Sequence, residues 1–147
     1  MSVEDKRKPI SVLMKTTIRQ GDKKEHLSLK GKGNVYVKNG YTYLLFKEIH
    51  NDKLNVQTTV KIGEQEATII RNGDLSMRQI YTVGEKTEGT YRSPYGYWQT
   101  SAKTHHCQYE WPANQTSGKL KLKYDYYLQN ESSGTFDVTI TIEEENE

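Results

Sequence analysis

The sequence predicts an all-β fold, an antiparallel up-and-down barrel of about eight to ten strands. β-branched and aromatic residues, which suit a pleated sheet, account for 47 of the 147 residues, whereas Ala, the best helix former, occurs only three times. Several segments alternate apolar and polar residues with a period of two. Turn-forming residues recur at short intervals between them, and closing the sheet into a barrel leaves no edge strand unpaired.

The chain has the length of a single domain. We expect residues 1–8 to form a flexible N-terminal segment, 9–144 a single β-barrel domain and 145–147 an acidic tail, because both ends are polar. The turns between strands are expected at Gly21, Asn39-Gly40, Asn51-Asp52, Gly63, Asn72-Gly73, Gly84, Pro94-Tyr95-Gly96, 112–118 and 130–134.

Individual strands can be read from the alternation. The segment 25–38 predicts one long strand that is kinked at Gly31 and Gly33. Three later segments have one apolar face and one polar face, which is typical of antiparallel sheet. Their apolar faces carry Leu54, Val56, Thr58, Val60 and Ile62, then Leu120, Leu122, Tyr124, Tyr126 and Leu128, then Phe136, Val138, Ile140 and Ile142.

Two Asn-Gly pairs predict two-residue type I′ hairpins, which set the register of their strands. The first hairpin places Lys38 opposite Tyr41 and puts Phe46 and Glu48 on the core face.

The second hairpin, at Asn72-Gly73, places Arg71 opposite Asp74. In that register the core face carries Thr68, Ile70, Leu75, Met77, Gln79 and Tyr81, and the outer face carries Ile69, Arg71, Arg78 and Ile80.

Four polar residues on predicted core faces are candidates for ligand binding: Glu48, Gln79, Tyr124 and Tyr126. An unpaired carboxylate in a core is costly, so Glu48 either lies at the barrel mouth, pairs with a cation, binds a ligand, or follows the point where its strand leaves the barrel. Sparse polar groups in an apolar lining fit a ligand cavity, and they also fit a satisfied polar core.

Arg71 and Arg78 form a second candidate set with Tyr91 and Tyr95. A regular hairpin puts both arginines on the outer face, whereas a bulge would turn Arg78 inward. They would then serve either as an anion or carboxylate clamp beside the two tyrosines, or as surface arginines paired with Asp74 or with a neighbouring strand.

The sequence gives no support to metal, cofactor or enzyme chemistry. In a regular strand His105 and Cys107 share one face, so they offer two ligands where a structural zinc site needs four. The single cysteine excludes an internal disulfide. No phosphate loop, dinucleotide fingerprint or nucleophile elbow occurs, so we expect no cofactor and no catalytic residues.

We expect a cytoplasmic protein without a membrane partner, because no apolar run suits a signal peptide or a membrane span. Lys119, Lys121 and Lys123 make a basic stripe on one strand, but a net charge of +2 argues against nucleic acid as a partner. The oligomeric state stays open.

Four segments resemble the YwiB-like family of small bacterial β-barrels: VYVKNGYTYL at 35–44, IRNGDLSMRQ at 70–79, GTYRSPYG at 89–96 and the strand at 120–127. The resemblance extends over nearly the whole chain. It implies a calycin-like barrel, similar to those of lipocalins and avidins, and it implies no activity, cofactor or site residue.

The sequence therefore favours a non-enzymatic protein that binds a small, partly apolar ligand in the barrel. The alternative is a protein or nucleic-acid interaction module with a filled interior. An open interior cavity would distinguish the first from the second.

Overall fold

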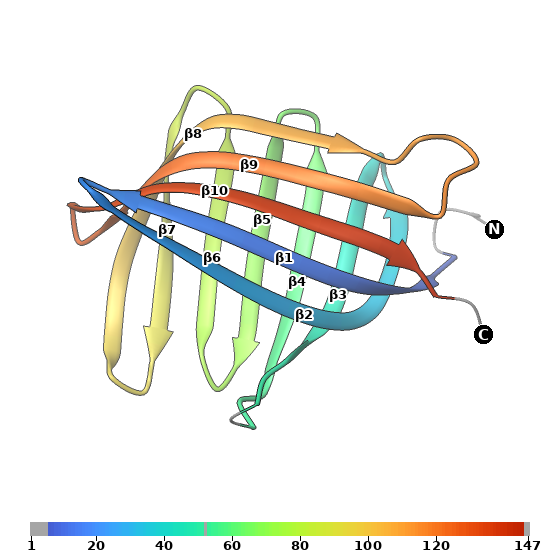
Figure 1. Cartoon of the computed structure of the whole chain (residues 1–147), viewed down its shortest axis with the longest axis horizontal. Coiled ribbons are helices and arrows are strands. Elements are labelled where there is room, and N and C mark those ends of the chain that lie inside the picture. The colour runs from blue at the N-terminus through green and yellow to red at the C-terminus, as the bar shows by residue number, and fades with distance from the viewer. Residues whose placement is uncertain (1–5, 52, 146–147) are drawn as a thin grey trace.

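The computed structural model of the protein describes residues 6–51 and 53–145. In this part of the chain ten antiparallel strands form a closed barrel, in which each strand pairs with its neighbour in sequence and β1 pairs with β10 (Figure 1). The predicted all-β, up-and-down barrel is confirmed. The strands are β1 (Lys8–Gln20), β2 (Lys23–Lys38), β3 (Tyr41–Ile49), β4 (Val56–Gly63), β5 (Glu66–Gly73), β6 (Ser76–Thr82), β7 (Lys86–Ser93), β8 (Gly96–Glu110), β9 (Ser117–Leu128) and β10 (Glu131–Glu144).

The barrel extends slightly beyond the expected domain ends. Lys8 already pairs with Val35, and the Glu145 N–H donates to the Pro9 carbonyl oxygen at 2.9 Å. Most of the expected flexible segment and acidic tail, residues 1–5 and 146–147, lies outside the described residues. Within those that are described, no helix could cross a membrane.

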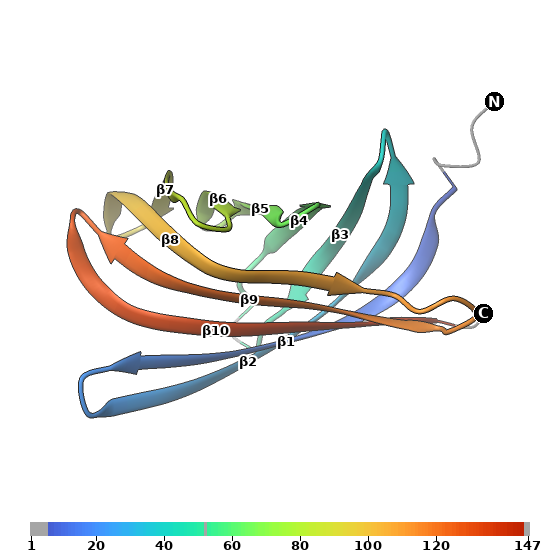
Figure 2. The same ribbon diagram turned by 90° about the horizontal axis from the view of Figure 1, so that it is seen from above.

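The barrel is flattened into two layers whose strands cross. β4–β7 form one layer, and β1, β9 and β10 run across them in the other (Figures 1 and 2). β2 bends from one layer to the other (Figure 1). The two predicted glycines lie in residues 30–35, which pair with β1 on one side and with β3 on the other. A Cβ atom at Gly33 would lie 1.8 Å from the Leu45 carbonyl oxygen, and one at Gly31 would lie 2.5 Å from the Phe46 ring. Glycine is therefore required for this close approach.

The core lies between the two layers, and its members match the predicted alternation. β4, β9 and β10 turn their predicted apolar faces inward. The fully buried residues of these strands include Val56, Val60, Leu120, Leu122, Ile140 and Ile142.

The first Asn-Gly hairpin is confirmed. Asn39 and Gly40 both have positive φ, at 53° and 83°, as a type I′ turn requires. Lys38 lies opposite Tyr41, and Glu48 lies opposite Gly31 on the inner face.

The second predicted hairpin is wrong. Asn72 does not adopt positive φ, and Gly73 still belongs to β5, where it pairs with Val56. Two hydrogen bonds hold Asp74 against the start of β4: its N–H donates to the Asn55 carbonyl oxygen, and its carboxylate accepts the Asn55 N–H. The β5–β6 pairing ends at Arg71 and Met77, so the five residues 72–76 separate the last pair, in place of the two residues of the predicted turn.

The longer connection shifts the register, so that Arg71 lies opposite Met77. A shift of this kind exchanges the two faces of a strand. β5 therefore turns Ala67, Ile69 and Arg71 inward, whereas Thr68 and Ile70, predicted for the core, are only partly buried.

Replacing Gly73 with Val should destabilise the fold by about 2–3 kcal/mol, through backbone strain and a clash. Gly73 has φ of 136°, and a Cβ atom there would lie 2.1 Å from the Asn55 carbonyl oxygen. Urea unfolding measures the loss. Gly84→Ala is the control, because Gly84 also has positive φ but has open space around it. Equal losses in both variants would show that the close contact with Asn55 contributes nothing.

Candidate functional site

A cavity of about 280 Å³ lies between the two layers of the barrel. Its lining is mostly apolar, and five of the lining residues carry polar side chains: Thr16, Ser28, Arg71, Tyr81 and Tyr124. The lining residues are Met14, Thr16, Leu27, Ser28, Leu29, Ile69, Arg71, Met77, Tyr81, Tyr124, Phe136 and Val138.

The cavity reaches the surface along the first half of β2. Residues 23–29 of β2 pair with β1, but pairing with β3 begins only at Lys30. Leu27, which lines the cavity, is 49% exposed. The gap beside this half-paired segment is therefore the mouth of the cavity.

Glu48 is buried at the edge of this interior and forms a bidentate ion pair with Arg71. The Arg71 Nε and Nη2 donate to the two carboxylate oxygens at 2.8 and 2.7 Å. The Thr58 hydroxyl donates at 2.6 Å, and the His50 Nε2 bonds the carboxylate at 2.7 Å. Glu48 is 3% exposed, so of the alternatives for this residue the structure shows pairing with a cation.

Glu48 stays ionised despite its burial. Burial raises the pKa of the carboxyl, but the hydrogen bonds from Arg71 and Thr58 and the positive charge of Arg71 outweigh it. The pKa of Glu48 consequently lies below its ordinary value of 4.5. At neutral pH its negative charge balances the positive charge of Arg71.

Gln79 is fully buried but belongs to the barrel wall. Its amide nitrogen donates to the carbonyl oxygens of Ile80 and Thr87, both at 3.1 Å. Its amide oxygen accepts the Thr100 hydroxyl at 2.7 Å. Both ends of the amide have protein partners, so Gln79 links β6, β7 and β8 and fits the satisfied polar core that the sequence also allowed.

Tyr124 and Tyr126 lie inside the barrel, as predicted, together with Tyr81. The hydroxyls of Tyr81 and Tyr124 are 3.5 Å apart, which is long for a hydrogen bond between oxygens. Tyr126 packs edge-on against Tyr124 and also contacts the ring of Phe136. Burial raises the pKa of all three phenols, so their hydroxyls remain protonated donors.

The four residues of the predicted clamp do not come together. Arg71 points into the barrel, so its predicted place on the outer face is wrong, whereas Arg78 is exposed on the outside. Tyr91 lies opposite Met77 and packs against Trp98, with ring centres 5.9 Å apart. Tyr95 is 93% exposed between β7 and β8.

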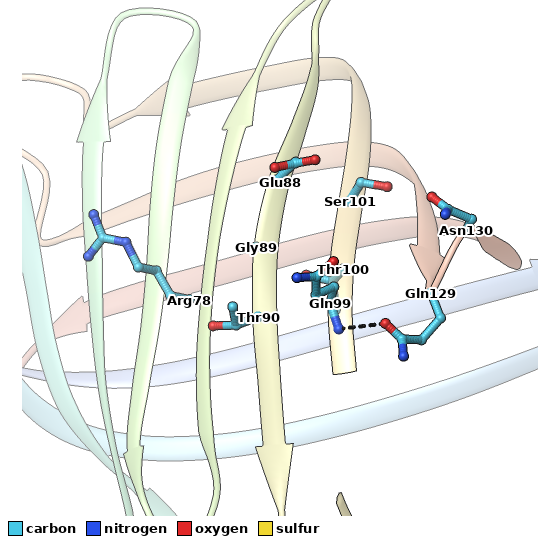
Figure 3. A pocket seen from close by; sticks show the side chains of 9 residues that line it. All are labelled: Arg78, Glu88, Gly89, Thr90, Gln99, Thr100, Ser101, Gln129 and Asn130. Atoms are coloured by element: carbon cyan, nitrogen blue, oxygen red, sulfur yellow. Dashed lines mark hydrogen bonds between the residues drawn. The ribbon is translucent and has the colours of Figure 1, made fainter. Parts of the chain in front are cut away.

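Arg78 instead lines an open groove of about 560 Å³ on the outer surface of β6–β8, shown in Figure 3. The Gln129 side chain closes one side of it by accepting the Gln99 backbone N–H at 3.0 Å. The groove is lined chiefly by hydroxyl, amide and charged groups.

His105 and Cys107 do not share a strand face, contrary to expectation, because a β-bulge interrupts β8 between Thr104 and His106. His105 is exposed and pairs with Asp125 at 2.8 Å. Cys107 lies opposite Leu122 and packs against the core, where burial raises the pKa of its thiol to about 11. Among residues 6–51 and 53–145, no three His, Cys, Asp or Glu side chains are placed to hold a metal ion.

Sequence reasoning missed Arg71 as the partner of Glu48, and it missed Thr58, His50 and Tyr81 as members of the site. A signal for His50 was present, because residues two apart in a strand share a face and His50 follows Glu48 by two. No sequence signal paired Arg71 with Glu48, since that contact depends on the register of β5.

The Glu48–Arg71 pair should show strong energetic coupling. Glu48→Gln leaves the Arg71 charge unbalanced and should cost about 3 kcal/mol, the low end for a buried pair, because the Arg71 side chain keeps 21% exposure. The double variant Glu48→Gln/Arg71→Met should lose at least about 1–2 kcal/mol less stability than the sum of the losses of the two single variants. Urea unfolding of the four proteins measures the coupling, and strict additivity would contradict it.

Stability should also depend on the protonation of Glu48. The pKa is lower in the folded than in the unfolded protein, so the unfolded state takes up the proton first as the pH falls. The stabilisation of the fold by ionised Glu48 is complete above pH 4.5 and is lost as the pH falls through the folded-state pKa of this carboxyl. Below pH 4.5 the free energy of unfolding should drop more steeply for the wild type than for Glu48→Gln, and parallel curves would rule this out.

Comparisons with known proteins identify the family. Residues 12–140 match the family described as domain of unknown function DUF1934. The chain is 28% identical over 135 residues to the uncharacterized β-barrel protein YwiB of Bacillus subtilis strain 168, covering 92% of this chain and 93% of the relative. The crystal structure of the B. subtilis ywiB protein is similar with a TM-score of 0.82 and 26% identity, over 95% of this chain and 94% of that one. The match spans most of the barrel, and the chain belongs to the DUF1934 family of YwiB-like β-barrel proteins.

Proposed function

We propose that this protein is a non-enzymatic binding protein that holds a small, partly apolar ligand inside the barrel. The interior cavity is the observation that supports this proposal. Its wall combines a mostly apolar surface with a few placed polar groups, as small-molecule sites generally do.

The size of the cavity sets the size of the ligand. A protein cavity of about 150 Å³ holds one benzene molecule. The 280 Å³ of this cavity is nearly twice that volume, which suits a two-ring compound or a medium-length alkyl chain. The mouth beside Leu27 gives such a ligand a route of entry.

The groups around the cavity favour binding over catalysis. Both oxygens of Glu48 are engaged by Arg71, Thr58 and His50, so the carboxylate has little capacity left to act as a base. The Cys107 thiol is neutral at physiological pH and packs against the core rather than lining the cavity.

The second candidate function is recognition of a partner by the outer surface. The polar groove beside Arg78 is the observation in its favour. Such a function would make no use of the interior, so the two candidates differ in how they respond to changes inside the barrel.

An uncharged two-ring dye tests the proposal. 1-Naphthylamine should bind the folded wild-type protein with one-to-one stoichiometry and with increased fluorescence. Met77→Trp fills the cavity and should weaken binding about tenfold or more. Arg78→Trp, the adjacent residue on the outer face of β6, is the matched control and should leave the affinity unchanged.

Fluorescence titration measures both affinities, and thermal unfolding checks that both variants are folded. Absence of saturable binding by the wild type would reject the interior site. If Met77→Trp and Arg78→Trp weaken dye binding equally, the interior site is also rejected, and recognition by the outer surface is favoured.

A further inference from the structure

We propose that the polar end of the cavity recognises an uncharged hydrogen-bond acceptor, such as an amide or ester carbonyl, and discriminates against a carboxylate of the same shape. This inference rests on the proposed function and specifies the polar group of the ligand. It follows from the donors that the cavity presents and from the balance of charge behind them.

Arg71, Tyr81 and Tyr124 line the cavity and can donate hydrogen bonds, and the hydroxyls of Thr16 and Ser28 can donate as well as accept. The pair with Glu48 uses the Arg71 Nε and Nη2, which leaves the Nη1 donors outside the pair. The hydroxyls of Tyr81 and Tyr124 are 3.5 Å apart and bind each other only weakly. A ligand group that meets these side chains satisfies them by accepting hydrogen bonds.

No anionic acceptor is left for a cationic ligand. Each oxygen of Glu48 already has two partners, which are Arg71 and His50 for one and Arg71 and Thr58 for the other. A ligand ammonium group would therefore find no free carboxylate to pair with and would lose its hydration, which costs several kcal/mol per ion.

The charge of Arg71 is already balanced. Glu48 lies 2.7 Å from Nη2 and remains ionised, so the pair as a whole is neutral. An incoming carboxylate would bring an unbalanced negative charge into the barrel and lose its hydration, which costs several kcal/mol per ion. A carbonyl oxygen loses much less hydration and accepts the same hydrogen bonds.

Three probes with the same alkyl chain separate these possibilities: octanamide, octanoate and octylamine. Calorimetric titration of the full chain at pH 8, where octanoate is an anion and octylamine a cation, measures their affinities. Octanamide should bind on the order of tenfold more tightly than octanoate, and octylamine should bind most weakly.

The outcomes distinguish failure of this inference from failure of the proposed function. If octanoate or octylamine binds as tightly as octanamide or more tightly, the cavity is a binding site but its polar end does not select an uncharged acceptor. If none of the three binds while the protein is folded, the proposed function fails and this inference fails with it.

A charge change behind the site gives a second test. Glu48→Gln removes the negative charge and keeps the shape, so Arg71 becomes an unbalanced cation. The preference should then reverse, with octanoate binding more tightly than octanamide. Asp125→Asn is the matched control, because it removes a carboxylate that is hydrogen-bonded to His105 outside the cavity lining and should preserve the wild-type preference.

Circular dichroism checks that both variants are folded. An unchanged preference in folded Glu48→Gln would overturn the charge-balance argument. If that variant does not fold, the order of the three wild-type affinities decides the inference alone.

Discussion

The buried ion pair between Glu48 and Arg71 is the constraint on which the interior of this barrel depends. A carboxylate with 3% exposure is tolerated only when its charge is compensated and its oxygens are bonded. Arg71 supplies the charge, and Thr58 and His50 supply the remaining hydrogen bonds. Glu48 lies in β3, and its partners come from β4, β5 and the segment after β3, so one carboxylate links three neighbouring strands. The pair can form only when β5 turns Arg71 inward.

This dependence explains why the second Asn-Gly pair misleads. Local preferences in strands and turns differ by about 1 kcal/mol, whereas an unbalanced buried charge costs about 3–5 kcal/mol. A two-residue turn at Asn72-Gly73 would have placed Arg71 outside and left Glu48 without its cation. The longer connection, anchored by Asp74 on Asn55, avoids that cost. The first Asn-Gly pair has no such conflict, because its regular register already puts Phe46 and Glu48 inside.

The sequence predicted what depends on neighbours along the chain. Period-two alternation identified the buried faces of β4, β9 and β10. The register of the first hairpin placed Glu48 inside, and Gln79 is buried as predicted although the hairpin register used to place it is wrong. Features that depend on contacts between strands far apart in the sequence could not be predicted from it. The bulge that separates His105 from Cys107 leaves no mark in the local alternation. The position of the cavity could not be predicted either, because it depends on where β2 stops pairing with β3 and on the crossing of the two layers.

The position of the ion pair bears on its role. Replacing a buried pair with apolar residues is often neutral or stabilising, so stability alone is a weak reason for Glu48 and Arg71 to occupy this interior. The pair is not at the centre of the apolar core: Arg71 lines the interior cavity, and its side chain keeps 21% exposure. A guanidinium fixed by two hydrogen bonds has already lost most of its freedom, which would reduce the entropic cost of holding a ligand under the proposed function. Orientation of Arg71 toward the cavity is therefore the role that the geometry of Glu48 supports best.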